Sequence, residues 1–413
     1  MRDLRASYFL IFAVLGAVLP YATIYFQESG LSPTQVGYAF AIWSGASIAS
    51  PVLVAWAADA ALDPRRLVLL CSGGAGACLV GLGFVRGVGS LFAVWTAYCA
   101  ISTPLLPLLD GIYFGQERVR TAAGEPPRAY HRVRVWGTVG YLLPAAILFE
   151  PLRRHAPAAY ALMSGAAFAA VAALHAQLVA DPRLPGPAGG AVVSTAKARL
   201  PTAAAARVLF RPQIAVFCAA LFLGQMASYA LAAFFPQYLT KRVGMDAGWA
   251  GAVSNFGVVI EVLFVLGAAR MTRALGVKGM IVVGLAATAV RLGMLAAVAS
   301  VAVALASVLV HGLLVVVLGV LPQPFLDRYA DDGYRHSVQG VFVMLMGFGK
   351  VAGSLAAGLI AQRSLEAAFA FAAGLCVLGA ALAAVAFRER RDDPVPPPAD
   401  APGFEAMPTE AVG

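Results

Sequence analysis

Residues 279–298 of this chain read GMIVVGLAATAVRLGMLAAV, and Arg291 is the one charged residue among them. Residues 300–325 follow as SVAVALASVLVHGLLVVVLGVLPQPF, which contain a histidine, His311, but no Asp, Glu, Lys or Arg. A helix of about 20 apolar residues crosses the roughly 30 Å hydrocarbon core of a bilayer. The two stretches therefore predict two consecutive transmembrane helices.

The rest of the chain repeats this pattern. Of 413 residues, 60% are hydrophobic and 12% are charged, against about 25% charged in ordinary soluble domains. Transmembrane β-strands would alternate over about ten residues, whereas these blocks are continuously apolar. We therefore predict an all-α membrane protein with twelve transmembrane helices, at 6–26, 34–58, 67–85, 90–114, 133–149, 157–179, 212–239, 248–269, 279–298, 300–325, 338–361 and 366–387.

A long polar stretch, rich in Gly, Pro and Ala, divides the predicted helices into two sets of six. We expect an N-terminal half at 1–180, a cytoplasmic central loop at 181–211, a C-terminal half at 212–387 and a disordered cytoplasmic tail at 388–413. Two pseudo-symmetric six-helix halves joined by such a loop resemble the major facilitator superfamily, whose halves are related by an axis along the membrane normal.

Lys and Arg predict the orientation in the membrane. With the N-terminus inside, 21 of the 30 Lys and Arg residues lie in cytoplasmic segments and 6 lie outside. This bias predicts a multi-pass protein of the bacterial inner membrane with both termini cytoplasmic. The same bias explains the net charge of +9 without a nucleic-acid partner.

Charged residues inside predicted spans need a reason, because an unpaired charge in the hydrocarbon costs several kcal/mol. Six titratable residues stand out across both halves: Asp110, Arg134, Glu261, Arg291, His311 and Lys350. Any one of them could form an ion pair that fixes helix packing. Together they predict a water-accessible cavity near the midplane, and their excess of one positive charge favours an anionic solute.

The segment at 130–141, YHRVRVWGTVGY, resembles the start of the fifth helix in the oligosaccharide:proton symporters and the related phenylpropionate-type permeases. In the lactose permease this run supplies an arginine to the sugar site. The resemblance assigns that role to Arg134, a stacking aromatic role to Tyr141 and the sugar-binding carboxylate to Asp110. The 20-residue separation of Arg291 from His311 repeats the arginine and histidine spacing of that family.

The chain also departs from the lactose permease. The glutamate that carries the proton there, three residues after the histidine, is Leu314 here, and no acid occurs in GQMASYALAAFFPQYL. Glu261 lies in VVIEVLFVL, which is similar to the phenylpropionate-type permeases. The resemblance is therefore nearer to that branch than to the lactose permease.

The loop after the second predicted span, AWAADAALDPRR, resembles the superfamily signature G-x-x-x-D-x-x-G-R-R/K. Asp59, Arg65 and Arg66 match it, while Ala55 replaces the first glycine. The resemblance implies a conformational gate in which these charges stabilise one of the two access states.

The combined pattern predicts a proton-coupled symporter that imports a small polar or anionic organic solute, such as an aromatic carboxylate, by alternating access. Glu261 is the first choice for the proton carrier, Asp110 the second, and His311 a relay, because a carboxyl buried in a cavity could exchange one proton in each cycle. A drug or metabolite exporter of the same fold stays open, as do nucleosides and oligosaccharides as solutes.

No catalytic constellation suggests an enzyme. The chain lacks the phosphate-binding motif G-x-x-x-x-G-K-[ST], so we expect no nucleotide-binding subunit. The five cysteines have no metal-ligand spacing. We expect a monomer in the lipid bilayer, with the proton as coupling ion and no metal or other cofactor.

Overall fold

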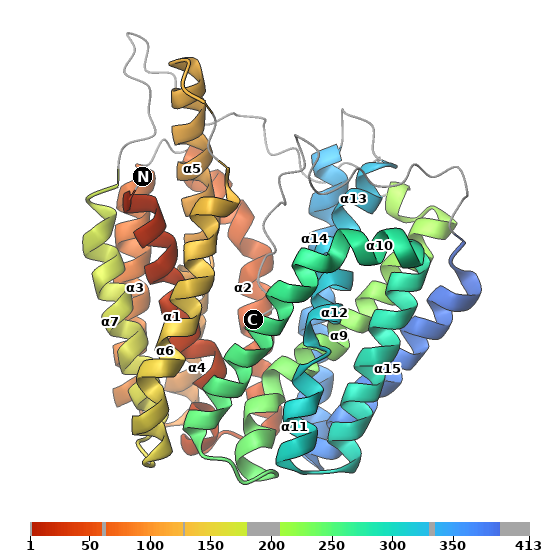
Figure 1. The fold of residues 1–413 in the computed structure, drawn as a ribbon. Coiled ribbons are helices and arrows are strands. Elements are labelled where there is room, and N and C mark those ends of the chain that lie inside the picture. The colour runs from red at the N-terminus through yellow and green to blue at the C-terminus, as the bar shows by residue number, and fades with distance from the viewer. Residues whose placement is uncertain (1, 60–62, 127–128, 180–206, 330–334, 389–413) are drawn as a thin grey trace. The chain divides into compact units, whose positions relative to one another are not determined.

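The computed structural model describes residues 2–59, 63–126, 129–179, 207–329 and 335–388, and these ranges contain helices and no strand (Figure 1). The helices before the central loop are α1 (Arg2–Glu28), α2 (Pro33–Asp59), α3 (Pro64–Phe84), α4 (Val88–Ser102), α5 (Leu105–Ala122), α6 (His131–Arg153) and α7 (Ala159–Ala176). Those after it are α9 (Pro212–Lys241), α10 (Ala247–Ala297), α11 (Val301–Val308), α12 (His311–Val315), the π-helical turn η1 (Val316–Val320), α13 (Pro322–Asp327), α14 (Arg335–Ala361) and α15 (Leu365–Ala386). The predicted all-α fold class is confirmed.

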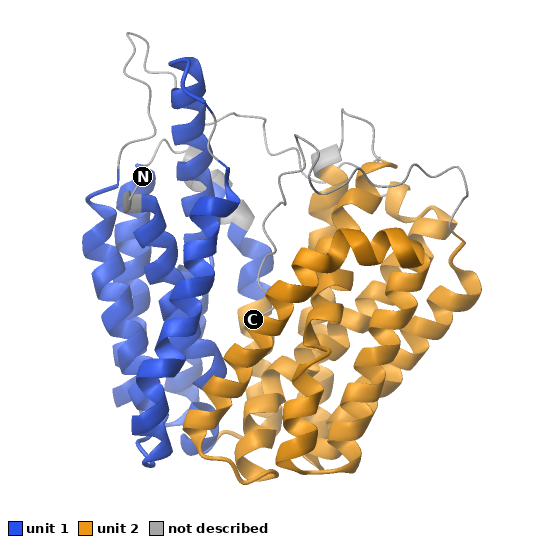
Figure 2. Cartoon of the chain, viewed as in Figure 1, with its two compact units in different colours: residues 1–30, 45–198 blue, residues 31–44, 199–413 orange. Residues whose placement is uncertain are grey.

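The chain divides into two compact units (Figure 2). Unit 1 comprises residues 1–30 and 45–198, and unit 2 comprises residues 31–44 and 199–413. The first turns of α2 group with unit 2 because they contact α14. Thr34 Oγ1 donates a hydrogen bond to the carbonyl of Gly358 at 3.3 Å, and a Cβ on Gly37 would lie 2.6 Å from the carbonyl oxygen of Ser354.

Ten described helical segments are long and apolar enough to cross a membrane. Ala247–Ala297 is counted once among them, although two predicted spans fall within it. The helix Pro33–Asp59, which holds another predicted span, is not among the ten. The count of twelve spans therefore stays a prediction.

Some predicted spans are split or joined in the structure. The span predicted at 90–114 is split into α4 and α5 at Pro104, because proline lacks a backbone N–H and its ring clashes with the preceding turn. The spans predicted at 248–269 and 279–298 are joined as α10, with a kink at Gly276 (φ 70°, ψ 172°). Glycine tolerates this positive φ because it has no Cβ.

Glycines allow close backbone approaches within each unit. In unit 1, a Cβ on Gly140 of α6 would overlap the carbonyl of Phe9 in α1. In unit 2, a Cβ on Gly353 of α14 would overlap the carbonyl of Met226 in α9. Membrane helices commonly pack through small residues in this way. The close approach of α1 and α6 places Arg134, in the first turn of α6, near Tyr8 and Phe12 of α1.

Candidate functional site

Asp110 on α5 links three segments of unit 1. Its Oδ1 atom accepts a hydrogen bond from the hydroxyl of Tyr8 on α1. The same oxygen accepts a second hydrogen bond, of 2.7 Å, from the hydroxyl of Tyr130, which immediately precedes α6. Both tyrosines are buried. A charged acceptor makes these bonds stronger than bonds between neutral groups, so one carboxylate oxygen ties α1 and the start of α6 to α5.

Arg134, one turn into α6, lies against aromatic rings. The centre of its guanidinium is 4.0 Å from the ring centroid of Phe12 and 5.9 Å from that of Tyr8. Both distances are within the range of a cation–π interaction. Arg134 lies near enough to Asp110 for their charges to interact. Among the described residues it forms neither an ion pair nor a hydrogen bond, and its buried Nε atom has no hydrogen-bond partner.

In unit 2, the structure brings together the predicted pair of Arg291 and His311. Arg291 Nη1 lies 2.8 Å from His311 Nδ1. A guanidinium has donors only, so Nδ1 accepts the hydrogen bond and the imidazole is neutral with its proton on Nε2. Arg291 is only 4% exposed, and its guanidinium lies 5.6 Å from the ring centroid of Phe235 on α9. The pair thus places a buried cation beside an aromatic face.

Glu261 lies on the face of α10 that packs against α12. A Cβ on Gly257, one turn earlier, would lie 3.5 Å from Cδ2 of His311, and one on Gly312 would meet the ring of Phe264 at 2.6 Å. Residues 257, 261 and 264 share one helix face. Glu261 is half-buried and forms neither an ion pair nor a hydrogen bond within the described ranges.

The remaining predicted site residues have simpler surroundings. The Lys350 ammonium on α14 lies 5.2 Å from the ring centroid of Tyr229 on α9. In unit 1, the backbone of Tyr141 packs against Gly16 of α1, and its side chain is half-buried. Each unit is described by itself, so a cavity shared by all six titratable residues stays a prediction.

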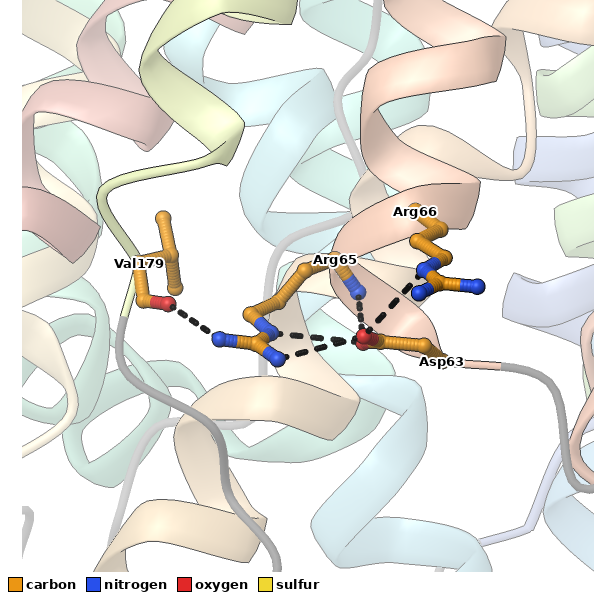
Figure 3. A network of polar contacts seen from close by, with 4 residues as sticks. All are labelled: Asp63, Arg65, Arg66 and Val179. Atoms are coloured by element: carbon orange, nitrogen blue, oxygen red, sulfur yellow. Dashed lines mark hydrogen bonds and ion pairs between the residues drawn. The ribbon is translucent and has the colours of Figure 1, made fainter.

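The segment predicted to act as a gate contains a further carboxylate, Asp63, with which both of its arginines interact (Figure 3). Asp63 accepts a hydrogen bond from the backbone N–H of Arg65 at 2.9 Å and pairs with the guanidinium of Arg65 at 3.2 Å. Arg66 Nε lies 4.0 Å from the same carboxylate, and Arg65 Nη1 donates to the carbonyl of Val179 at 3.5 Å. Asp59 ends α2, and its side chain lies outside the described residues.

A local signal could have identified Asp63. Asp followed by Pro and a helical run is typical of a helix N-cap with proline at the first helical position. Tyr8, Phe12 and Phe235 carried no comparable signal, because single aromatic residues are ordinary in membrane helices. Tyr130 lies in the quoted motif, yet nothing in the sequence distinguished it as a partner of Asp110.

None of the described parts of the chain brings together three or more His, Cys, Asp or Glu side chains that could hold a metal ion. The candidate site consists, in each unit, of an arginine near a phenylalanine ring. Asp110 lies near the arginine of unit 1, and His311 bonds to that of unit 2. Such groups can bind a solute that combines an aromatic ring with hydrogen-bonding groups.

Known proteins place this chain in a family. Residues 1–373 match the MFS_1 like family. "Putative nucleoside transporter YegT" of Escherichia coli (strain K12) is 24% identical over 360 residues, which cover 82% of this chain and 79% of that relative. The chain belongs to the MFS_1 like family and thus to the major facilitator superfamily, as the sequence resemblance implied.

Solved structures agree in fold. The crystal structure of nucleoside transporter NupG has a TM-score of 0.79 and 18% identity, covering 94% of this chain and 99% of that chain. A POT family transporter in complex with a thioalcohol conjugated peptide has a TM-score of 0.69 and 12% identity, with coverage of 93% and 96%. The chain is a multi-span membrane transporter and not an enzyme.

Proposed function

We propose that this transporter is a proton-coupled symporter that imports nucleosides by alternating access. Nucleosides were one of several solute classes that the sequence left open. They are now favoured because one relative is named a nucleoside transporter and a solved structure of similar fold is one. The small aromatic carboxylate that the excess positive charge suggested becomes the second candidate.

One observation in the structure carries the proposal. Each unit holds an arginine within cation–π distance of a phenylalanine ring and beside a further polar group. In unit 1 these are Arg134, Phe12 and Asp110, and in unit 2 they are Arg291, Phe235 and His311. A nucleoside combines an aromatic base with a hydroxylated ribose. Aromatic faces and guanidinium planes stack on bases, while carboxylates and imidazoles accept hydrogen bonds from hydroxyls.

Glu261 supports the proton-coupling part of the proposal. An ionised carboxylate in an apolar span costs several kcal/mol without a partner, and Glu261 has neither an ion pair nor a hydrogen bond with any described residue. It would therefore bind a proton in this state and release it when a cation or water becomes available. His311 begins α12, which packs against the same face of α10, and would relay that proton.

Transport into proteoliposomes tests the proposal. With an inside-alkaline pH gradient, we expect radiolabelled uridine and adenosine to accumulate above the external concentration, and an uncoupler to abolish the accumulation. Benzoate, phenylpropionate and lactose serve as competitors in matched assays. Accumulation of an aromatic acid without nucleoside uptake would overturn the assigned solute. Expulsion of nucleosides from right-side-out vesicles against their gradient would favour the exporter.

A further inference from the structure

The two hydrogen bonds to Asp110 leave half of its carboxylate open. Both tyrosine hydroxyls donate to Oδ1, and Asp110 makes no other hydrogen bond or ion pair within the described part of the chain. Each carboxylate oxygen can accept about two hydrogen bonds. Oδ1 is therefore saturated by the protein, whereas Oδ2 has its acceptor sites free.

The donors that hold Oδ1 are themselves fixed by packing. Tyr8 is 0% exposed and Tyr130 is 4% exposed. The ring of Tyr130 stacks on Phe114 with a centroid distance of 5.6 Å and meets the edge of Tyr113 at 5.1 Å. Because aromatic rings have only two side-chain torsions, their packing sets where the hydroxyls lie. The orientation of the carboxylate follows from these two hydroxyls.

Arg134 does not occupy the open oxygen. Its guanidinium lies over the ring of Phe12, which holds the cation near Asp110 without a hydrogen bond or ion pair to the carboxylate. The group that would satisfy Oδ2 must be a donor, because an ionised carboxylate is an acceptor only. A solute hydroxyl meets this requirement.

We propose that Tyr8 and Tyr130 are positioning residues that present Asp110 Oδ2 to a ribose hydroxyl of the transported nucleoside. The inference rests on the proposed function for its solute. It assigns a different donor to each oxygen of Asp110: Oδ1 accepts hydrogen bonds from the two tyrosines, and Oδ2 accepts one from the solute. Three segments of unit 1 must then keep their packing for the hydroxyl to be recognised.

Binding of uridine and of its 2′-, 3′- and 5′-deoxy analogues tests the inference. We expect the purified protein to bind one analogue roughly 10- to 100-fold more weakly than uridine, the range for the loss of a hydrogen bond to a charged group. The ratio of the dissociation constant of that analogue to that of uridine measures the hydroxyl contact. In Asp110→Asn this ratio should fall to about 1 to 3, because an amide is a neutral acceptor. Tyr8→Phe and Tyr130→Phe should each reduce the ratio severalfold while keeping both rings.

Tyr113→Phe is the matched control, since it removes a hydroxyl from a ring that packs on Tyr130 but makes no bond to Asp110. The ratio should stay as in the wild type. Because the readout compares two ligands on one variant, a general loss of stability does not mimic the effect, and two independent tyrosine variants guard against one that does not fold.

Three results would count against the inference. If Asp110→Asn still distinguishes uridine from the deoxy analogue as strongly as the wild type, Asp110 does not contact the hydroxyl. If the affinity ratio falls in Asp110→Asn but stays at the wild-type value in Tyr8→Phe and Tyr130→Phe, the tyrosine hydroxyls do not position the carboxylate. Either result leaves nucleoside transport intact. Failure of the wild-type protein to bind any nucleoside would instead overturn the proposed function and the inference with it.

Discussion

In unit 1 the carboxylate of Asp110 is the group with hydrogen-bond partners, whereas in unit 2 the partnered group is the cation, Arg291. Arg134 contacts two aromatic rings but has no hydrogen bond or ion pair, and Glu261 has no polar contact among the described residues. Both units thus contain an arginine and a carboxylate, but the hydrogen bonds are made by the carboxylate in unit 1 and by the arginine in unit 2.

This difference suggests separate tasks for the two carboxylates. Moving Asp110 would break two hydrogen bonds from buried tyrosines, and each buried donor left unsatisfied costs about 1–3 kcal/mol. Glu261 can change partner or protonation without breaking a polar contact to any described residue. A fixed carboxylate suits solute recognition, and an unpartnered one suits proton exchange.

The largest expected effect belongs to Glu261→Gln, which keeps the shape and removes the titration. We expect gradient-driven accumulation to be abolished while counterflow exchange and solute binding stay largely intact, because exchange need not release the proton. Asp110→Asn is the paired variant and should weaken binding but still allow accumulation. Uptake and counterflow in proteoliposomes measure both. Wild-type accumulation in Glu261→Gln would exclude this residue as the coupling site.

Replacing each arginine by lysine compares the two aromatic contacts. Arg291→Lys loses the planar group that bonds to His311 at 2.8 Å, and we expect solute affinity to fall about tenfold, the size of one lost charged hydrogen bond. Arg134→Lys should have a smaller effect, because an ammonium can still interact with the ring of Phe12. Equilibrium binding decides between them. Equal losses would indicate that Arg134 makes a hydrogen bond to the solute.

A stability comparison tests the helix approaches in the two units. Gly140→Ala in unit 1 and Gly353→Ala in unit 2 would each place a Cβ against a backbone carbonyl, and we expect a cost of about 1–3 kcal/mol for the overpacking. Gly111→Ala is the control, since its Cβ would meet nothing within 4 Å. Thermal melting in detergent should rank the control highest. A melting temperature of Gly140→Ala equal to that of the control would contradict the close α1–α6 approach.

The smallest expected effect concerns the segments that follow the second helix of each half. Asp63 caps α3 in unit 1, whereas the corresponding segment of unit 2, GAARMTRALGVK, has no acid and α10 continues through a kink at Gly276. Asp63→Ala should lower stability by about 1 kcal/mol, while Asp63→Asn, which keeps a capping oxygen, should stay near the wild type. Equal destabilisation by both variants would instead point to the ion pair with Arg65.

The sequence alone was sufficient for the all-α membrane fold and for the superfamily. Lipid-facing helices must be continuously apolar over about 20 residues, so an apolar composition and the length of each apolar run predict them. The cost of charge in hydrocarbon likewise identified Asp110, Glu261, Arg291 and His311 as residues that need an explanation.

Only the tertiary structure decided which partners these residues have. Tyr8 and Tyr130 are 122 residues apart in sequence but donate to the same oxygen, and that contact depends on how α1, α5 and α6 pack. The same holds for Phe12 and Phe235, which look like any other aromatic residue of a membrane helix until a guanidinium is found over each ring. Composition and spacing specify which segments enter the membrane, whereas side-chain partners are set by packing between helices that are distant in sequence.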